Sequence, residues 1–190
     1  MKILTFILIS FLFSSGTHNV VPNKSTIKWV GTKTTGSHEG TIMIKDGYVK
    51  IDKNNLISGQ INIDMNSIIC TDIKKISTNK YFVDHLKNDD FFAVDKFPIA
   101  SLDILSSKLV KDQNYEIIAN LTIKNITKKI NFIAYIDINQ NMAKAKGRLE
   151  IDRSKFNIKY KSKTWFPDIG DYFIYDIFEL DFDLNAELDS

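Results

Sequence analysis

Hydrophobic and polar residues alternate along most of this chain with a period of two, which is typical of half-buried β-strands. The last such run is the clearest, because Phe178, Leu180 and Phe182 share one parity while Glu179 and Asp181 share the other. About eight runs alternate in this way, near residues 25–32, 40–52, 59–68, 98–109, 114–124, 129–139, 142–152 and 177–188. Since strands with one apolar face must close or stack to hide it, the pattern predicts one all-β domain, either a sandwich or a barrel.

A long link joins the third strand to the fourth and predicts a short helical insertion at roughly residues 77–92. Thr78 is expected to cap this helix at its N-terminus. Phe82 and Leu86 lie four residues apart, so they share one face and form an apolar stripe. We therefore expect the helix to pack on the strands through this stripe.

Two adjacent aromatic residues, Phe91 and Phe92, follow the helix in a loop that also carries Asp89, Asp90 and Asp95. Exposing both rings to water would be costly, so at least one ring is expected to plug an apolar interior. The pair is therefore predicted to close part of that interior or to contact a ligand.

Composition narrows the class of protein. The chain has 190 residues, of which 44% are hydrophobic and 25% are charged, and these values suit one globular domain. The formal net charge is +2, and the 25 basic residues are scattered among 23 acidic ones. Because no basic block or stripe is present in the sequence, no nucleic-acid partner is expected.

The N-terminus resembles an export signal. Lys2 gives a positive start, an apolar run follows from Ile3 to Phe13, and small residues precede Thr17. The alternative is a membrane anchor, but a spanning helix needs about 20 apolar residues. The sequence therefore predicts a signal peptide over residues 1–16, a mature domain over residues 17–190 and no stable membrane anchor after cleavage.

The residues typical of catalytic and metal sites are dispersed. Cys70 is the only cysteine, and its apolar neighbours favour packing over nucleophilic chemistry. His38 is expected to bond a nearby backbone group, His85 to help seat the helix, and His18 to lie at a terminus. Carboxylates such as Asp176 are interpreted as solvated rather than as paired catalytic acids. No enzyme activity, cofactor or metal is expected.

Two arginines stand among many lysines. Arg153 follows Asp152 at a strand end, where an ion pair that braces the turn is favoured over contact with a ligand phosphate. Arg148 is the other arginine. Three lysines before Trp165 share one parity and are open to two interpretations, a head-group contact at a barrel mouth or simple exposure to water: Lys159, Lys161 and Lys163.

Five short motifs span much of the chain: GSHEG at 36–40, DMNSI at 64–68 with Asp72, HLK at 85–87 with DFF at 90–92 and Phe97-Pro98, LTIKNITK at 121–128, and IDR at 151–153 with FNI at 156–158. In order and approximate spacing they resemble the YceI-like family of polyisoprenoid-binding proteins. The resemblance covers roughly residues 22–188. The run from Trp165 to Leu180 is similar to a longer subgroup that is associated with Bacteroidota.

This resemblance implies a lipocalin-like antiparallel β-barrel that is exported to the periplasm or secreted. Its interior would take a polyisoprenoid, an isoprenoid quinone or a similar long-chain lipid for carriage or sequestration. The side chains expected to bind this ligand are Trp29, Ile63, Met65, Phe91, Phe92, Leu121, Phe132, Leu149, Leu180 and Phe182.

Two other functions stay open. A barrel filled by its own side chains would serve as an envelope stress or interaction protein, and the interior volume would reveal it. An enzyme acting on a lipid or quinone would need a partly buried histidine or carboxylate inside the barrel. A homodimer is also left open by the sequence.

Overall fold

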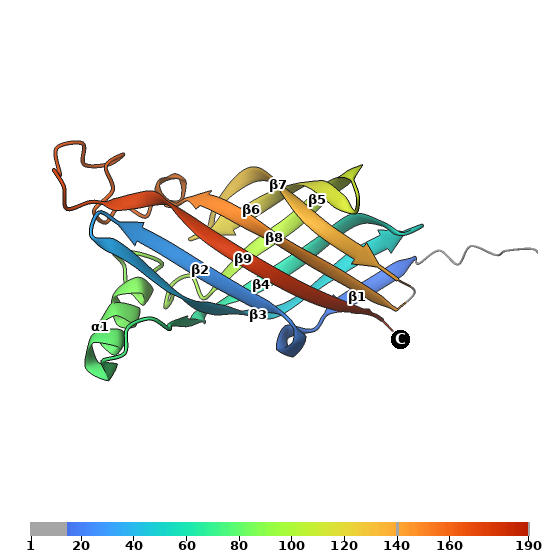
Figure 1. Ribbon diagram of the computed structural model, residues 1–190, viewed down its shortest axis with the longest axis horizontal. Coiled ribbons are helices and arrows are strands. Elements are labelled where there is room, and N and C mark those ends of the chain that lie inside the picture. Colours follow the sequence, from blue (N-terminus) through green and yellow to red (C-terminus); the bar gives the residue numbers. More distant parts are fainter. Residues whose placement is uncertain (1–14, 140, 190) are drawn as a thin grey trace, which may run out of the picture.

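The computed structural model describes residues 15–139 and 141–189, which form an all-β fold with one α-helix (Figure 1). The elements of these residues are β1 (Gly16–Val20), η1 (Pro22–Lys24), β2 (Thr26–Lys33), β3 (Gly36–Asp52), β4 (Asn55–Cys70), α1 (Ile76–Lys87), β5 (Ile99–Lys111), β6 (Asn114–Ile123), β7 (Ile126–Ile138), β8 (Met142–Asp152), η2 (Arg153–Phe156) and β9 (Ile174–Leu188). The predicted signal peptide falls almost entirely on residues 1–14, which lie outside the described residues, so it stays a prediction.

Eight strand positions close into an antiparallel barrel. Each strand from β2 to β8 pairs with the next one in sequence, and β9 pairs with β2 to complete the ring. The short strand β1 pairs with both β3 and β9, so it continues the position of β2 beyond η1. The barrel of about eight strands with one helical insertion is confirmed. Strand β1 was not predicted, because its five residues are mostly polar and adjoin the expected cleavage site.

The alternation of the sequence sets the two faces of the wall. In β6 every second side chain is buried, and these are Tyr115, Ile117, Ala119, Leu121 and Ile123. On the outside, Arg148 Nε donates to Asp181 Oδ1 at 2.7 Å, and Lys146 Nζ lies 2.9 Å from Asp183 Oδ2. The acidic face of β9 is therefore on the outer surface, as predicted, and is paired with cations of β8.

Four hairpins of the described residues have turns of two residues. In three of them both turn residues have positive φ: Lys53–Asn54, Asp112–Gln113 and Lys124–Asn125. Such turns match the twist of the flanking strands. The predicted strands near residues 114–124 and 129–139 left a longer link between them, but β7 already begins at Ile126. The tight turns keep the barrel wall continuous.

The helix α1 lies at one end of the barrel, beside the loop that precedes β9 (Figure 1). The predicted cap at Thr78 is wrong, because the helix begins at Ile76 and Lys75 holds the N-cap position without a side-chain bond. Instead, the Asn79 amide donates to the carbonyls of Cys70 and Ile73 at 2.9 and 3.0 Å. Among the described residues, no helix has the length and apolarity needed to cross a bilayer.

Candidate ligand-binding cavity

The barrel encloses a cavity of about 490 Å³. Its wall consists mainly of inward-facing aliphatic and aromatic side chains from all parts of the barrel. The structure places all ten predicted ligand-binding residues on this wall: Trp29, Ile63, Met65, Phe91, Phe92, Leu121, Phe132, Leu149, Leu180 and Phe182. The interior is therefore a cavity rather than a fully packed core, and the predicted residues face it together.

Part of the interior is filled by close packing. A cluster of buried side chains comprises Leu56, Tyr115, Ile117, Ala119, Ala134 and Ile136. Nearby, the rings of Phe132 and Phe182 meet edge to face at 6.0 Å. A Cβ added to Gly147 would lie 2.7 Å from the Phe182 ring. Gly147 of β8 therefore makes room for the large Phe182 side chain of the neighbouring strand β9.

The mouth of the cavity lies at the end of the barrel that carries α1. Its exposed lining residues come from the end of β2, the β2–β3 turn, the segment before β9 and the start of β9, and they are Thr32, Lys33, Thr34, Thr35, Lys161, Tyr172 and Tyr175. Among the remaining described lining residues, only Lys144 is exposed. Polar groups are thus concentrated where the cavity meets water.

The aromatic pair after α1 closes one side of this mouth. Phe91 is buried and its ring lies 5.1 Å from the His85 ring and 5.3 Å from the Tyr160 ring. Phe92 is half-buried and meets Phe178 edge to face at 6.3 Å. Both rings line the cavity, so the insertion delivers them to the interior as the sequence predicted.

The helix packs on the mouth through its apolar stripe. The Phe82 ring lies 4.7 Å from the His38 ring and 6.4 Å from the Trp29 ring, and Leu86 lines the cavity. His85 Nε2 lies 3.0 Å from Asp90 Oδ2 and contacts Tyr160 edge to face. These contacts seat α1 on the barrel, in agreement with the role expected of His85.

His38 bonds a carboxylate and not a backbone group, so that part of the prediction is wrong. Its Nδ1 lies 2.8 Å from Asp72 Oδ2, and Asp72 Oδ1 accepts from the Cys70 thiol at 3.1 Å and from the Glu39 N–H at 3.1 Å. Partial burial opposes ionisation of Asp72, but the hydrogen bonds from His38, Cys70 and Glu39 outweigh it and lower its pKa to about 2.

Cys70 is a packed, unreactive thiol. Burial raises its pKa, and the bond to the negative Asp72 acts in the same direction, so the nucleophilic thiolate is disfavoured. Within residues 15–139 and 141–189, no group of three histidine, cysteine or acidic side chains is arranged to hold a metal ion.

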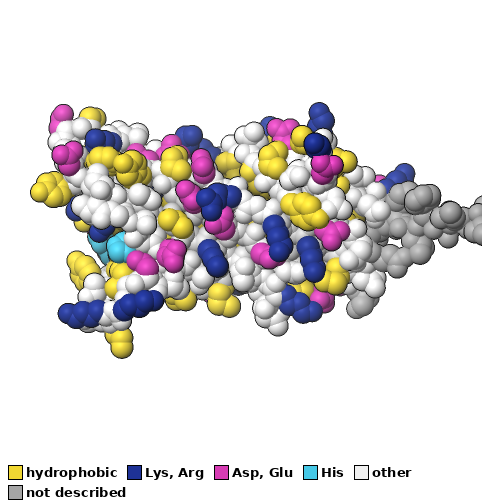
Figure 2. Space-filling model, in the orientation of Figure 1, with side chains coloured by type: hydrophobic (Ala, Val, Ile, Leu, Met, Phe, Trp, Pro, Cys, Tyr) yellow, Lys and Arg dark blue, Asp and Glu magenta, His cyan; other side chains and the backbone are white. Residues whose placement is uncertain are grey.

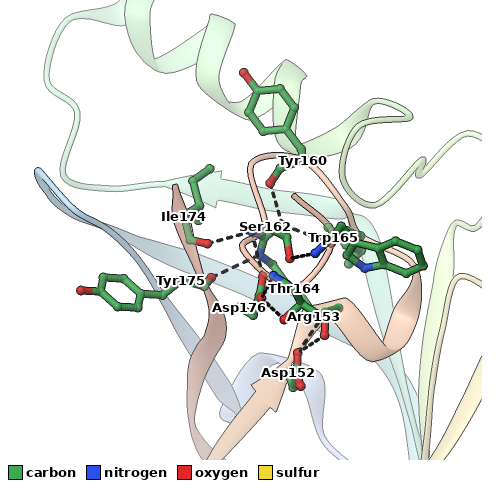
Figure 3. A network of polar contacts seen from close by, with 11 residues as sticks. Asp152, Arg153, Tyr160, Ser162, Thr164, Trp165, Ile174, Tyr175 and Asp176 are labelled. Atoms are coloured by element: carbon green, nitrogen blue, oxygen red, sulfur yellow. Dashed lines mark hydrogen bonds and ion pairs between the residues drawn. The ribbon is translucent and has the colours of Figure 1, made fainter. Parts of the chain in front are cut away.

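Arg153 organises the loop at the mouth (Figure 3). The side chain is 4% exposed and donates to the carbonyls of Tyr160 at 2.8 Å and Ile174 at 2.9 Å. It also donates to the carbonyls of Ile158 and Tyr175, each at 3.2 Å.

The acid that pairs with Arg153 is Asp176, at 3.2 Å, and not its neighbour Asp152. Burial lowers the pKa of the guanidinium, and the Asp176 carboxylate opposes this effect. The N–H groups of the Arg153 guanidinium donate to partners within the protein. Arg153 therefore holds the mouth loop in place, and its guanidinium is not available to bind a ligand phosphate. The interpretation of Asp176 as a solvated carboxylate is also wrong, because its side chain is 16% exposed.

A family model described as a YceI-like domain matches residues 18–186. The chain belongs to the YceI-like family. No curated protein matches it in sequence. The closed barrel agrees with this family, and the expected resemblance is confirmed at the level of the family.

Solved structures share the YceI-like fold. BcnA from Burkholderia cenocepacia aligns with a TM-score of 0.70 at 24% identity, covering 88% of this chain and 99% of that protein. A polyisoprenoid binding domain from Saccharophagus degradans, implicated in plant cell wall breakdown, has a TM-score of 0.65 at 15% identity, covering 93% and 100%. The YceI protein of Campylobacter jejuni has a TM-score of 0.57 at 14% identity, covering 100% and 94%.

Proposed function

We propose that this YceI-like protein binds a long apolar lipid, a polyisoprenoid or an isoprenoid quinone, inside its barrel for carriage or sequestration in the bacterial envelope. The observation that carries the proposal is the apolar cavity of about 490 Å³ with its polar mouth. Ligand pockets typically measure about 300–1,000 Å³ and are lined mostly by apolar groups. The description of the Saccharophagus degradans domain as polyisoprenoid binding supports the same class of ligand.

The chemistry of the wall suits an unsaturated hydrocarbon chain. Binding there depends on contact and on removal of apolar surface from water, since the inward side chains of the strands offer few hydrogen-bonding groups. Polar atoms gather at the mouth, near Lys33, Lys161 and Tyr172. A lipid would therefore lie with its chain inside the barrel and its head group at the rim.

The two alternatives fit less well. A filled barrel would leave no cavity of this size. For an enzyme, His38 is the feature to weigh, because it lines the cavity and pairs with Asp72. Across the described residues, however, no hydrogen bond joins His38 to a serine, threonine or cysteine nucleophile, and we propose a binding protein without catalytic activity.

The direct test is extraction of the protein, purified from its native envelope, followed by lipid mass spectrometry. A prenol or prenyl quinone at near one mole per mole of protein is the expected result. Ala134→Trp and Ala145→Phe should fill the cavity and reduce recovery of the lipid more than they reduce the melting temperature. Ile133→Trp on the outward face of β7 is the matched control and should retain the lipid. Equal recovery from all variants with the fold intact would refute binding in the barrel.

We also propose that the protein is exported, belongs to the longer Bacteroidota-type subgroup and reaches the periplasm or the medium. N-terminal sequencing of protein from the periplasmic fraction should start near Thr17, and a chain that still begins at Met1 in the inner membrane would contradict export. The oligomeric state, including the homodimer, is tested by light scattering of the purified protein.

A further inference from the structure

An exposed surface of aromatic and lysine side chains adjoins the cavity mouth. Lys33, Lys161 and Tyr172 line the cavity itself, whereas Trp165 and Phe166 line a groove next to it. We call this surface the collar and define it by Lys33, Lys161, Lys163, Trp165, Phe166 and Tyr172. Tyr172 is 79% exposed, Phe166 50% and Trp165 43%. Figure 2 shows hydrophobic and basic side chains at this end, over the helix and the loop before β9. Large exposed apolar side chains grouped at one place mark an interaction surface.

The collar is held in shape by the protein. The Thr34 hydroxyl donates to the Asp171 carbonyl at 2.7 Å, which joins the β2–β3 turn to the loop. The Phe166 N–H donates to the Ser162 carbonyl at 2.8 Å, and Arg153 anchors both ends of the same loop through Tyr160 and Ile174. The aromatic rings are therefore presented outward by a fixed loop.

Charge at the collar favours an anionic partner. Lys159 Nζ lies 4.0 Å from the Trp165 ring centre, and Lys163 Nζ lies 4.0 Å from that of Phe173. Among the described residues, none of the lysines at 33, 159, 161 and 163 has a carboxylate within ion-pair distance. The exposed carboxylates of the loop are fewer, namely Asp168 and Asp171. Asp89 and Asp90 line the adjoining groove, but they already pair with Lys96 and His85.

We propose that the collar docks this end of the barrel on a lipid bilayer that contains anionic head groups. Tyrosine and tryptophan favour the boundary between hydrocarbon and water, and lysine stems reach along it while their amines meet the head groups. Because the cavity opens through the collar, an apolar chain would pass from the bilayer into the barrel without crossing water. This inference rests on the proposed lipid cargo. Docking of the collar would give that lipid a route from the bilayer into the barrel.

The test is flotation of the purified protein with vesicles of phosphatidylcholine, with or without phosphatidylglycerol. Binding should require phosphatidylglycerol and fall with added salt. The double variant Phe166→Ser/Tyr172→Ser should weaken it about tenfold, as expected for loss of two partly inserted rings. The control is Leu109→Ser/Val110→Ser, which removes two exposed apolar side chains near the β5–β6 turn at the opposite end of the barrel, and it should bind as the parent does.

A second measurement follows Trp165, whose emission should shift to the blue on binding, and Trp165→Phe should remove most of that change. Flotation that is absent, or that both double variants weaken equally, would overturn docking by the collar, as would dependence on a second protein instead of lipid. Uptake of solanesol from detergent, measured on the same variants, tests binding of the lipid cargo independently of docking on the bilayer. Uptake without flotation would refute the docking alone, whereas flotation without uptake would refute the cargo alone.

Discussion

Gly40, in the barrel wall near the mouth, allows its backbone to lie very close to Trp29 and to the Ile69 carbonyl group. It stands opposite Trp29 in the β2–β3 register, and an added Cβ would lie 1.9 Å from the Ile69 carbonyl oxygen and 2.5 Å from the Trp29 ring. Gly40→Ala should therefore reduce the free energy of unfolding by about 2–3 kcal/mol, which denaturant titration would measure. Gly31→Ala is the control, because an added Cβ there meets nothing within 4 Å. Equal stability of the two variants would show that the backbone around Gly40 shifts to accommodate the added methyl group, and would contradict this prediction.

Asp72 makes part of the folding stability of the protein depend on pH. Its pKa is lowered from 3.8 to about 2 in the folded protein, so its contribution is present above pH 4 or so and is lost as the pH falls toward 2. Asp72→Asn should melt lower than the parent at neutral pH, and the difference should shrink across this acidic range. Asp84→Asn replaces an exposed carboxylate on α1, so it is the control and should change the melting temperature at neutral pH little. Parallel melting curves for Asp72→Asn and the parent at all pH values would contradict this account.

At the scale of elements, the two rings that follow α1 have different surroundings. Phe91 is 8% exposed and packs on His85 and Tyr160, so Phe91→Ala should cost about 3–5 kcal/mol of folding free energy. Phe92 is half-buried against Phe178, so Phe92→Ala should cost less stability and more retention of a bound prenol. Calorimetry without lipid and retention of solanesol would separate the two. If both variants melt and bind as the parent does, the insertion is a surface feature.

The elements that the sequence predicted are those with a local pattern. Side chains alternate across a strand, so inward residues such as Leu121 and Leu180 could be assigned without knowing their neighbours. Pairings between distant residues could not be predicted, because His38 and Asp72 are 34 positions apart and meet only when β3 and β4 pair. The helix start was missed for a related reason, since Asn79 is held by carbonyls of the preceding strand and loop rather than by a local cap.

The same limit applied to Arg153. Its position after a strand indicated an ion pair, but several acids were available, and only closure of the barrel brings Asp176 at the start of β9 to it. The polar neighbours of Arg153 in sequence, Asp152 and Ser154, gave no sign that its guanidinium would be buried and would need a carboxylate from a distant strand. The sequence therefore supplied the wall of the cavity, whereas the polar contacts that shape its mouth required the three-dimensional structure.

For the molecule as a whole, the end opposite the mouth must be closed if the barrel is to hold a lipid. Strand β1 bridges β3 and β9 there, and its Val20 side chain is 8% exposed and lines the cavity. The neighbouring Asn19 faces outward and is exposed. One charge placed at either position thus tests whether β1 seals the interior.

Val20→Asp should lower the melting temperature by several degrees and release a bound prenol, because the carboxylate would be buried without a partner. Asn19→Asp adds the same charge one residue earlier and should leave both properties close to those of the parent. The measurements are thermal melting and loss of preloaded solanesol to excess detergent over time. Retention of the prenol by Val20→Asp at a temperature where the barrel is folded would mean that β1 is an accessory strand and that the far end is sealed by the packed side chains of β6 and β7 alone.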